Sequence, residues 1–160
     1  MSAERRLSER GLALPQPPRV PPGVTVPFQW VRVHGSRALV SGHGALGPDG
    51  APIGPFGRVP TEVSLPEAQE SARLGTLAML AALRRAIGSF DRVEAWLIVN
   101  GFVNAEAGYP QTTSVLNPCS ELLLDVFGPE IGAHARTAIG VAALPLNLPV
   151  VISAEVALVA

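Results

Sequence analysis

The chain has 160 residues and a mass of 16.7 kDa, which is the size of one domain and excludes a second catalytic domain. Only 16% of its residues are charged, against about 25% in an ordinary soluble domain, and 48% are hydrophobic, so we expect part of its surface to be covered in an assembly. Twelve Arg and no Lys against 13 acidic residues give a net charge of -1, a balance that argues against nucleic acid or an anionic membrane as a partner.

Residues 1–23 are expected to precede the main domain, residues 24–160, as a short helix and a proline-rich arm. Ser2 can cap a helix over residues 2–10, and Gly11 is a typical helix stop. Five prolines follow within the next eleven residues and predict an extended connector.

The main domain is predicted to contain seven elements. They are strands over residues 26–33 and 37–41 joined by a His34-Gly35-Ser36 hairpin, a helix over 65–87 between a Ser64-Leu65-Pro66-Glu67 capping box and Gly88, a strand over 93–103, a second helix that ends at Phe127, and strands over 136–143 and 150–159. This order predicts an α+β layer in which two helices cover one face of the sheet. The other face, where Trp96, Ile98 and Phe102 are expected, needs a partner.

The cellular location is predicted from cysteine usage and apolar segments. The single cysteine, Cys119, excludes an internal disulfide, and residues 1–6 lack the apolar core of a signal peptide. Residues 137–160 are apolar apart from Glu155, but two prolines and an asparagine in their middle predict two strands and a turn rather than a membrane span. We therefore expect a cytoplasmic protein without a membrane segment.

Several short motifs resemble those of the YjgF/RidA family. They are Ser41-Gly42, Asp91-Arg92-Val93, Gly101-Phe102-Val103-Asn104, Asn117 ahead of Leu122-Leu123-Leu124-Asp125-Val126-Phe127-Gly128, and above all His134-Ala135-Arg136-Thr137-Ala138-Ile139-Gly140-Val141 followed by Leu144-Pro145. The match covers nearly the whole chain, and Leu12 to Pro15 is similar to a segment of the family's longer bacterial branch.

The resemblance implies a chorismate-mutase-like α+β fold, with a mixed sheet and two helices on one face. It also implies a homotrimer with a ligand cleft at each subunit boundary. The implied activity is hydrolysis of reactive enamine or imine intermediates to 2-keto acids and ammonia, without a cofactor. An older label of the family is endoribonuclease L-PSP.

Arg136 and Gly42 are the first two candidate ligand-binding residues. Arg136 is the only charge between residues 135 and 154, and a guanidinium binds a carboxylate through two parallel hydrogen bonds. From the sequence alone, a solvated arginine at a strand end explains Arg136, and a turn explains Gly42. The resemblance implies instead that Arg136 holds the substrate carboxylate and that Gly42 lies in the cleft.

Phe28 and Asn117 each have two interpretations. Phe28 stands where many family members have a tyrosine that reaches the ligand, so its ring either walls an apolar pocket or packs in the core. Asn117 matches an asparagine beside the cleft, although its position before Pro118 also suits a helix N-cap.

Val151 is the main departure from the family pattern. Counting from Arg136, the resemblance places the catalytic glutamate at Val151 and a second glutamate at Ser153, and neither residue has a carboxylate. Glu155 shares that strand face but lies roughly 13 Å from position 151, at about 3.3 Å per residue. A replacement for the glutamate is therefore expected elsewhere or not at all.

The remaining reactive residue types predict no further site. His43, next to Gly42, is the one histidine with a route to the cleft as an acid or base, although a solvated loop histidine is the competing interpretation. His34 and His134 are placed in a turn and a loop, and no Ser-His-Asp order is evident. Cys119 lies on an apolar helix stripe and is interpreted as a core residue, and the scattered histidines give no metal-ligand spacing.

Two functions remain, and Val151 separates them. The first is a RidA-like enzyme that hydrolyses small imino or enamino acids held by Arg136. The second is a non-catalytic trimer that binds a small carboxylate, such as a 2-keto acid, in the same cleft. RNA cleavage is disfavoured because the chain lacks a basic surface and an evident acid-base pair.

Overall fold

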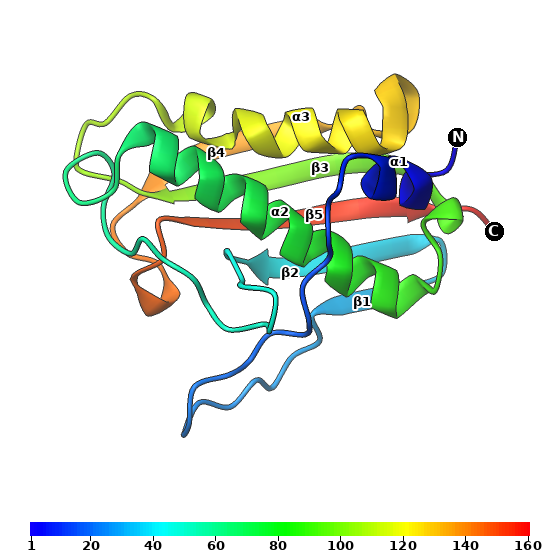
Figure 1. Ribbon diagram of the computed structural model, residues 1–160, viewed down its shortest axis with the longest axis horizontal. Coiled ribbons are helices and arrows are strands. Elements are labelled where there is room, and N and C mark those ends of the chain that lie inside the picture. Colours follow the sequence, from blue (N-terminus) through cyan, green and yellow to red (C-terminus); the bar gives the residue numbers. More distant parts are fainter.

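The computed structural model describes residues 1–160 and has an α+β fold (Figure 1). Its helices are α1 (Ala3–Glu9), α2 (Leu65–Ile87) and α3 (Thr112–Ile131), with short 3-10 turns at Phe90–Arg92 and Pro145–Asn147. Its strands are β1 (Val31–His34), β2 (Arg37–His43), β3 (Val93–Asn104), β4 (Ala135–Val141) and β5 (Val150–Leu158). They form one mixed sheet in the order β1-β2-β5-β3-β4, in which only β3 and β4 are parallel.

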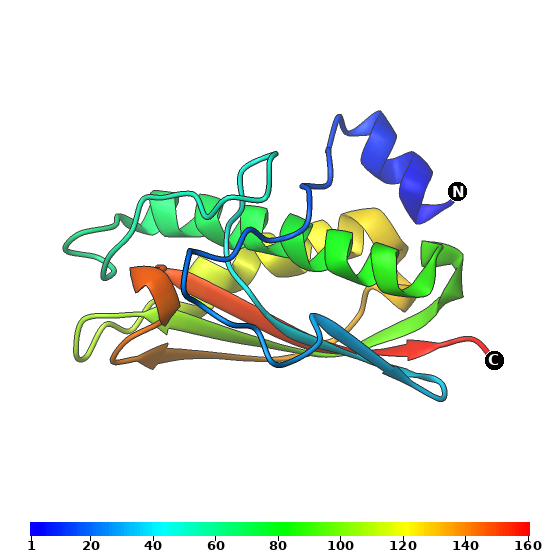
Figure 2. The same cartoon turned by 90° about the horizontal axis from the view of Figure 1, so that it is seen from below.

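Two long helices, α2 and α3, lie on the same face of the sheet, as the sequence predicts (Figure 2). Helix α2 begins where predicted because the backbone N–H of Glu67 bonds the Ser64 hydroxyl at 3.2 Å and the Glu67 carboxylate accepts from the Ser64 N–H at 3.1 Å. Gly75 lets α2 approach β2 closely, since a Cβ there would lie 3.5 Å from the His43 carbonyl oxygen. The helix thereby covers the strand that carries Gly42.

The core lies between these helices and the sheet. It is one cluster of 30 buried residues, to which Ala3 and Leu7 of α1 also belong. Cys119 of α3 is fully buried in it, which confirms the interpretation of this residue as part of the core.

Helix α3 starts earlier than the N-cap interpretation of Asn117 requires, so that interpretation is wrong. Its N-cap is Gln111, and both Asn117 and Pro118 lie inside the helix. Proline has no N–H to donate to the carbonyl four residues before it. The side-chain amide of Gln69 donates to that carbonyl, on Ser114, at 2.9 Å, so the interior proline leaves no unpaired group there.

The placement of Trp96 on the uncovered face is also wrong. The register of β3 against β5 shifts between Trp96 and Ile98, so that Trp96 pairs with Val156 and Ile98 with Glu155. This bulge turns Trp96 into the core, where it is 1% exposed, while Ile98 and Phe102 stay on the uncovered face.

The first strand is shorter than predicted, because the chain over residues 26–30 is not paired as a strand and β1 begins at Val31. Pro27 has no N–H for a ladder. The segment touches β2 only near its end, where Ser41 donates through its N–H to the Trp30 carbonyl and through its hydroxyl to the Gln29 carbonyl.

The face opposite the helices is uncovered in the single chain (Figure 2). Leu39, Leu97 and Ile139 are each more than 40% exposed. The apolar C-terminal segment forms β4, a turn and β5, as predicted. None of the helices combines the length and the apolar character that crossing a membrane requires.

Candidate functional site

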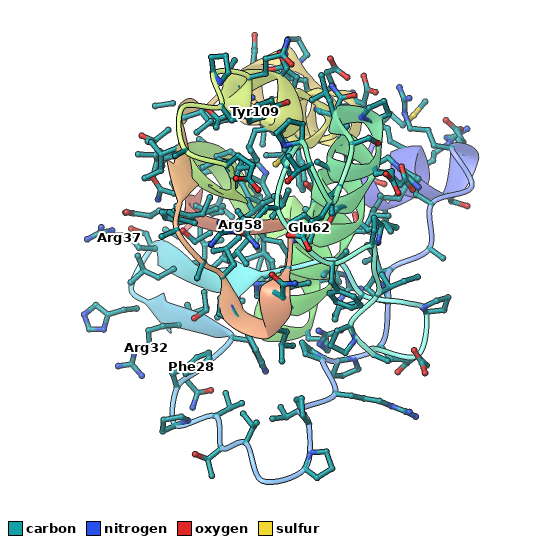
Figure 3. The ribbon with its side chains drawn as sticks, turned by 90° about the vertical axis from the view of Figure 1, so that its left-hand side faces the viewer. Phe28, Arg32, Arg37, Arg58, Glu62 and Tyr109 are labelled. Carbon is teal, nitrogen blue, oxygen red and sulfur yellow. The ribbon has the colours of Figure 1, made fainter.

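Three of the predicted site residues, Phe28, Gly42 and Val151, lie around one cavity of about 440 Å³. The cavity lies between the proline-rich arm, the end of β2 and the turn that precedes β5. We call it the arm pocket and define it by six of its lining residues, which are Phe28, Trp30, Gly42, His43, Leu146 and Val151. Figure 3 shows Phe28 below Arg32, where the arm joins β1. No acidic side chain lines this pocket.

A bulge at the end of β2 forms one wall of the arm pocket. Val40 pairs with Ala154 and His43 with Ile152, so three residues of β2 advance against two of β5. The extra residue makes room for the close approach of Gly42 to β5, where a Cβ on Gly42 would lie 2.8 Å from Val151 Cγ1. Only glycine fits there without displacing Val151.

The same bulge turns His43 inward. The ring is 3% exposed, its Nδ1 lies 2.6 Å from the Ser41 carbonyl oxygen, and it packs against Trp30 with 5.2 Å between ring centroids. A carbonyl can only accept, so Nδ1 carries the proton and Nε2 is a bare acceptor. Burial lowers the pKa of His43, and the Arg85 charge lowers it further. His43 is therefore neutral at pH 7, with its Nε2 closed off from solvent and without a partner.

The other two predicted residues, Arg136 and Asn117, lie together at the far edge of the sheet. The Arg136 guanidinium donates to Ser120 Oγ at 3.0 Å, to Asn117 Oδ1 at 3.0 Å and to the Thr113 carbonyl at 3.3 Å. Each of these acceptors is neutral, and no carboxylate forms an ion pair with Arg136. Three bonds engage three of its five N–H groups, which leaves two.

A histidine completes this group. His134 Nε2 lies 2.8 Å from Ser120 Oγ, and His134 Nδ1 lies 2.7 Å from the Gly132 carbonyl oxygen. We call Asn117, Ser120, His134 and Arg136 the edge cluster. Ser120 is not among the residues predicted for the site, whereas His134 lies in the loop before β4, as predicted.

The spacing of polar residues along α3 indicates that Ser120 shares a helix face with Asn117. Thr113, Asn117 and Ser120 recur at intervals of four and three residues, which places them on one helix face. That polar stripe faces Arg136 of β4, while the neighbouring Cys119 faces the core.

Within one chain the two groups do not meet. Across the sheet, Arg136 of β4 pairs with Val99 of β3, which pairs with Ala154 of β5. Ala154 in turn pairs with Val40 of β2, so Arg136 and Val40 are three strand spacings apart. At about 4.8 Å per interval the separation is roughly 14 Å. A small ligand bound to Arg136 therefore does not reach the arm pocket of the same chain.

The rest of the molecule holds no comparable site. A second hollow of about 360 Å³ lies between Arg58, Tyr109 and the end of β4, and it contains none of the predicted residues; Figure 3 shows Arg58 and Tyr109 on that side. No three metal-ligating side chains lie together. Burial raises the pKa of Cys119 to about 11, so its thiol is not a nucleophile in the folded protein.

Known proteins resemble this chain in sequence and in structure, although no family model matches it. Protein TCP17 of Trypanosoma cruzi is 37% identical over 102 residues, which make up 64% of this chain and 64% of that protein, so the match spans less than two thirds of either. Atu1372 of Agrobacterium tumefaciens, a protein of unknown function, is 30% identical, with a TM-score of 0.84 over 98% of this chain and 91% of that one.

A candidate endoribonuclease of Shewanella oneidensis has the same fold, with a TM-score of 0.89, 24% identity and coverage of 98% of this chain and 99% of its own. The Rid family protein YyfA of Yersinia pestis shares the fold at a TM-score of 0.59 and 18% identity, over 85% of this chain and 91% of its own. The same holds for TdcF of E. coli, solved with bound serine, at a TM-score of 0.58, 20% identity and the same coverage. The chain therefore has the fold of Rid family proteins, and the motif from His134 to Val141 leads into and forms β4 of that fold.

Proposed function

We propose that the protein binds a small carboxylate of the 2-keto or imino/enamino acid class and has little imine-hydrolysing activity. The observation that carries the proposal is Arg136, a guanidinium fixed by three neutral acceptors, without an ionic partner and with two free N–H groups. The free N–H groups of such a cation can donate charge-assisted hydrogen bonds to a carboxylate. The bound serine in the structural neighbour TdcF, a ligand with a carboxylate, agrees with this class.

The ligand's apolar part is assigned to the arm pocket of a neighbouring copy. Within one chain Arg136 and the pocket are too far apart for a small ligand, and the uncovered sheet face exposes Leu39, Leu97 and Ile139. A homotrimer with clefts at its subunit boundaries satisfies both observations. Light scattering tests the assembly directly, with an expected mass of about three times 16.7 kDa.

Weak hydrolysis follows from the missing carboxylate. Imine hydrolysis needs a water molecule held and polarised beside the carbon, and a positioned general base contributes about 10²- to 10⁴-fold. Val151 lines the arm pocket, and the resemblance to the family implies a glutamate at this position. Glu155, on the same strand face, is bound by Arg37 in an ion pair, and so does not replace it.

A coupled assay tests both halves of this proposal. The enamine 2-aminoacrylate is generated in the cuvette, and its conversion to pyruvate is followed with the parent protein and three variants. We expect little acceleration by the parent and an increase for Val151→Glu, with Val151→Gln as the uncharged control of similar size. Strong acceleration by the parent that is lost in Arg136→Ala would show that another group activates water.

A further inference from the structure

Ser120, one of the three acceptors that fix Arg136, also pairs with the His134 imidazole, and the proposed carboxylate binding does not use the acid-base chemistry of that pair. Their Oγ and Nε2 atoms are 2.8 Å apart, within the range in which a base activates a nucleophile. Both side chains are half-buried, so the hydroxyl lies near the surface between α3 and the edge strand β4.

The proton positions in this pair are set by the backbone. The Gly132 carbonyl lies 2.7 Å from His134 Nδ1 and can only accept, so Nδ1 of the neutral ring carries the hydrogen. Nε2 is then an acceptor, and the Ser120 hydroxyl donates to it. Gly132 is buried at the end of α3, where its N–H bonds the Gly128 carbonyl at 2.9 Å. The orienting carbonyl is therefore held in place by the helix end.

Arg136 adds a fixed positive charge beside the hydroxyl oxygen. Its Nη1 donates to Ser120 Oγ at 3.0 Å, so the serine oxygen sits between an imidazole acceptor and a guanidinium donor. Negative charge that develops on this oxygen, or on a carbonyl oxygen attached next to it, is stabilised by the guanidinium. No carboxylate is paired with Arg136 to cancel that charge.

We propose that Ser120 is an activated nucleophile that cleaves small, activated carboxylic esters. Ser120 Oγ forms a bond to the ester carbonyl carbon, and its proton passes to His134 Nε2. The carbon-oxygen bond to the leaving group breaks, and the departing alcohol takes that proton. Water then repeats the sequence on the acyl-serine, releases the carboxylic acid and restores the hydroxyl, with no change of oxidation state.

Position along α3 separates Ser120 from the other candidate nucleophiles. Cys119, its neighbour, is fully buried, and its thiol pKa is raised by burial. Ser114 lies on the same helix, is half-buried like Ser120 and has no histidine partner, so it is a matched control.

Labelling with a fluorophosphonate tests the proposal, because such a probe forms a phosphonyl-Oγ bond as fluoride leaves an activated serine. Intact-protein and peptide mass spectrometry on the parent should place the label on Ser120. We expect labelling to be abolished in Ser120→Ala, slowed by about 10²-fold in His134→Gln, and unchanged in Ser114→Ala. Thermal melting of each variant confirms that it is folded.

Hydrolysis of 4-nitrophenyl acetate provides the second readout. The parent should release nitrophenol in a burst that Ser120→Ala lacks. Equal labelling of the parent and Ser120→Ala, no labelling of the parent, or a His134→Gln rate equal to the parent rate would each overturn the proposal. None of these outcomes bears on carboxylate binding, which is measured separately with non-acylating ligands.

Discussion

The arm pocket and the edge cluster belong to the same sheet but have opposite chemistry. The pocket is lined mainly by apolar and aromatic side chains, with Arg19 and Thr25 but no acid, and its deeply buried polar ring, His43, is held neutral. The edge cluster is a polar network around a guanidinium that lacks an ionic partner. The resemblance to the family assigned residues from both regions to one ligand. In the proposed function, their separation in the chain means that each supplies half of a recognition site, one for a charge and one for an apolar body.

Removing the charge should have the largest effect. Arg136→Ala is expected to weaken pyruvate binding by roughly 30- to 150-fold, because charge-assisted bonds contribute about 2 to 3 kcal/mol. Arg136→Lys should restore little, since an ammonium cannot copy the planar fork that Ser120 and Asn117 orient. Isothermal titration calorimetry measures both, with Arg32→Ala, an exposed arginine outside the cluster, as the control. Equal affinity for parent and Arg136→Ala would show that the edge cluster does not bind the carboxylate.

Mixing subunits should reveal whether the two regions cooperate across an interface. Gly42→Leu fills the arm pocket where even a Cβ meets Val151, and Arg136→Ala removes the charge, so neither homotrimer binds ligand. Co-refolding equal amounts should restore about a quarter of the sites, those with the intact arginine of one copy and the intact pocket of another. The number of binding sites per chain, measured by titration calorimetry, detects this recovery. If both regions acted within one chain, no site would return.

Sequence motifs predicted correctly the helix ends that are fixed by contacts between residues close together in the sequence. Helix α2 begins and ends where its Ser64-Glu67 capping box and Gly88 place its ends. Gly42 and Val151 were both placed in the cleft by the resemblance to the family, and they lie side by side at the arm pocket.

Long-range adjustments account for the failures. Trp96 was misplaced by a bulge that only the pairing with β5 creates. Asn117 was misread because a side chain from α2, Gln69, satisfies the carbonyl that Pro118 frees. The Ser120-His134 pair forms because the turn after α3 brings β4 back along that helix. The bulge at Trp96 and the contact of Gln69 have no signature in the neighbouring residues, whereas the spacing of Asn117 and Ser120 indicates a polar face of α3 but not its partner His134.

The buried histidine should make the stability of the arm pocket depend on pH. Burial lowers the pKa of His43 in the folded state below the 6.5 of an unperturbed histidine. When the pH falls below about 6.5, the unfolded chain binds a proton that the native state excludes, so stability is lost as the pH falls toward the folded-state pKa. Thermal melting between pH 8 and 5 should show a smaller decrease for His43→Phe than for the parent. His34→Phe, a change at the exposed end of β1, should leave the parent's decrease intact.

The smallest effect is expected at Cys119, which is next to Ser120 of the edge cluster in sequence but lies on the core-facing side of α3. Burial raises the pKa of its thiol to about 11, although a hydrogen bond from Thr76 and the charge of Arg136 act in the other direction. At pH 8 the thiol is therefore protonated and enclosed, and a disulfide reagent should not modify the folded protein. Addition of guanidinium chloride should expose one reactive thiol per chain in step with unfolding, as followed by circular dichroism. Rapid modification without denaturant would mean that α3 opens locally, and the edge cluster on its outer side would then not be the fixed arrangement on which the serine chemistry rests.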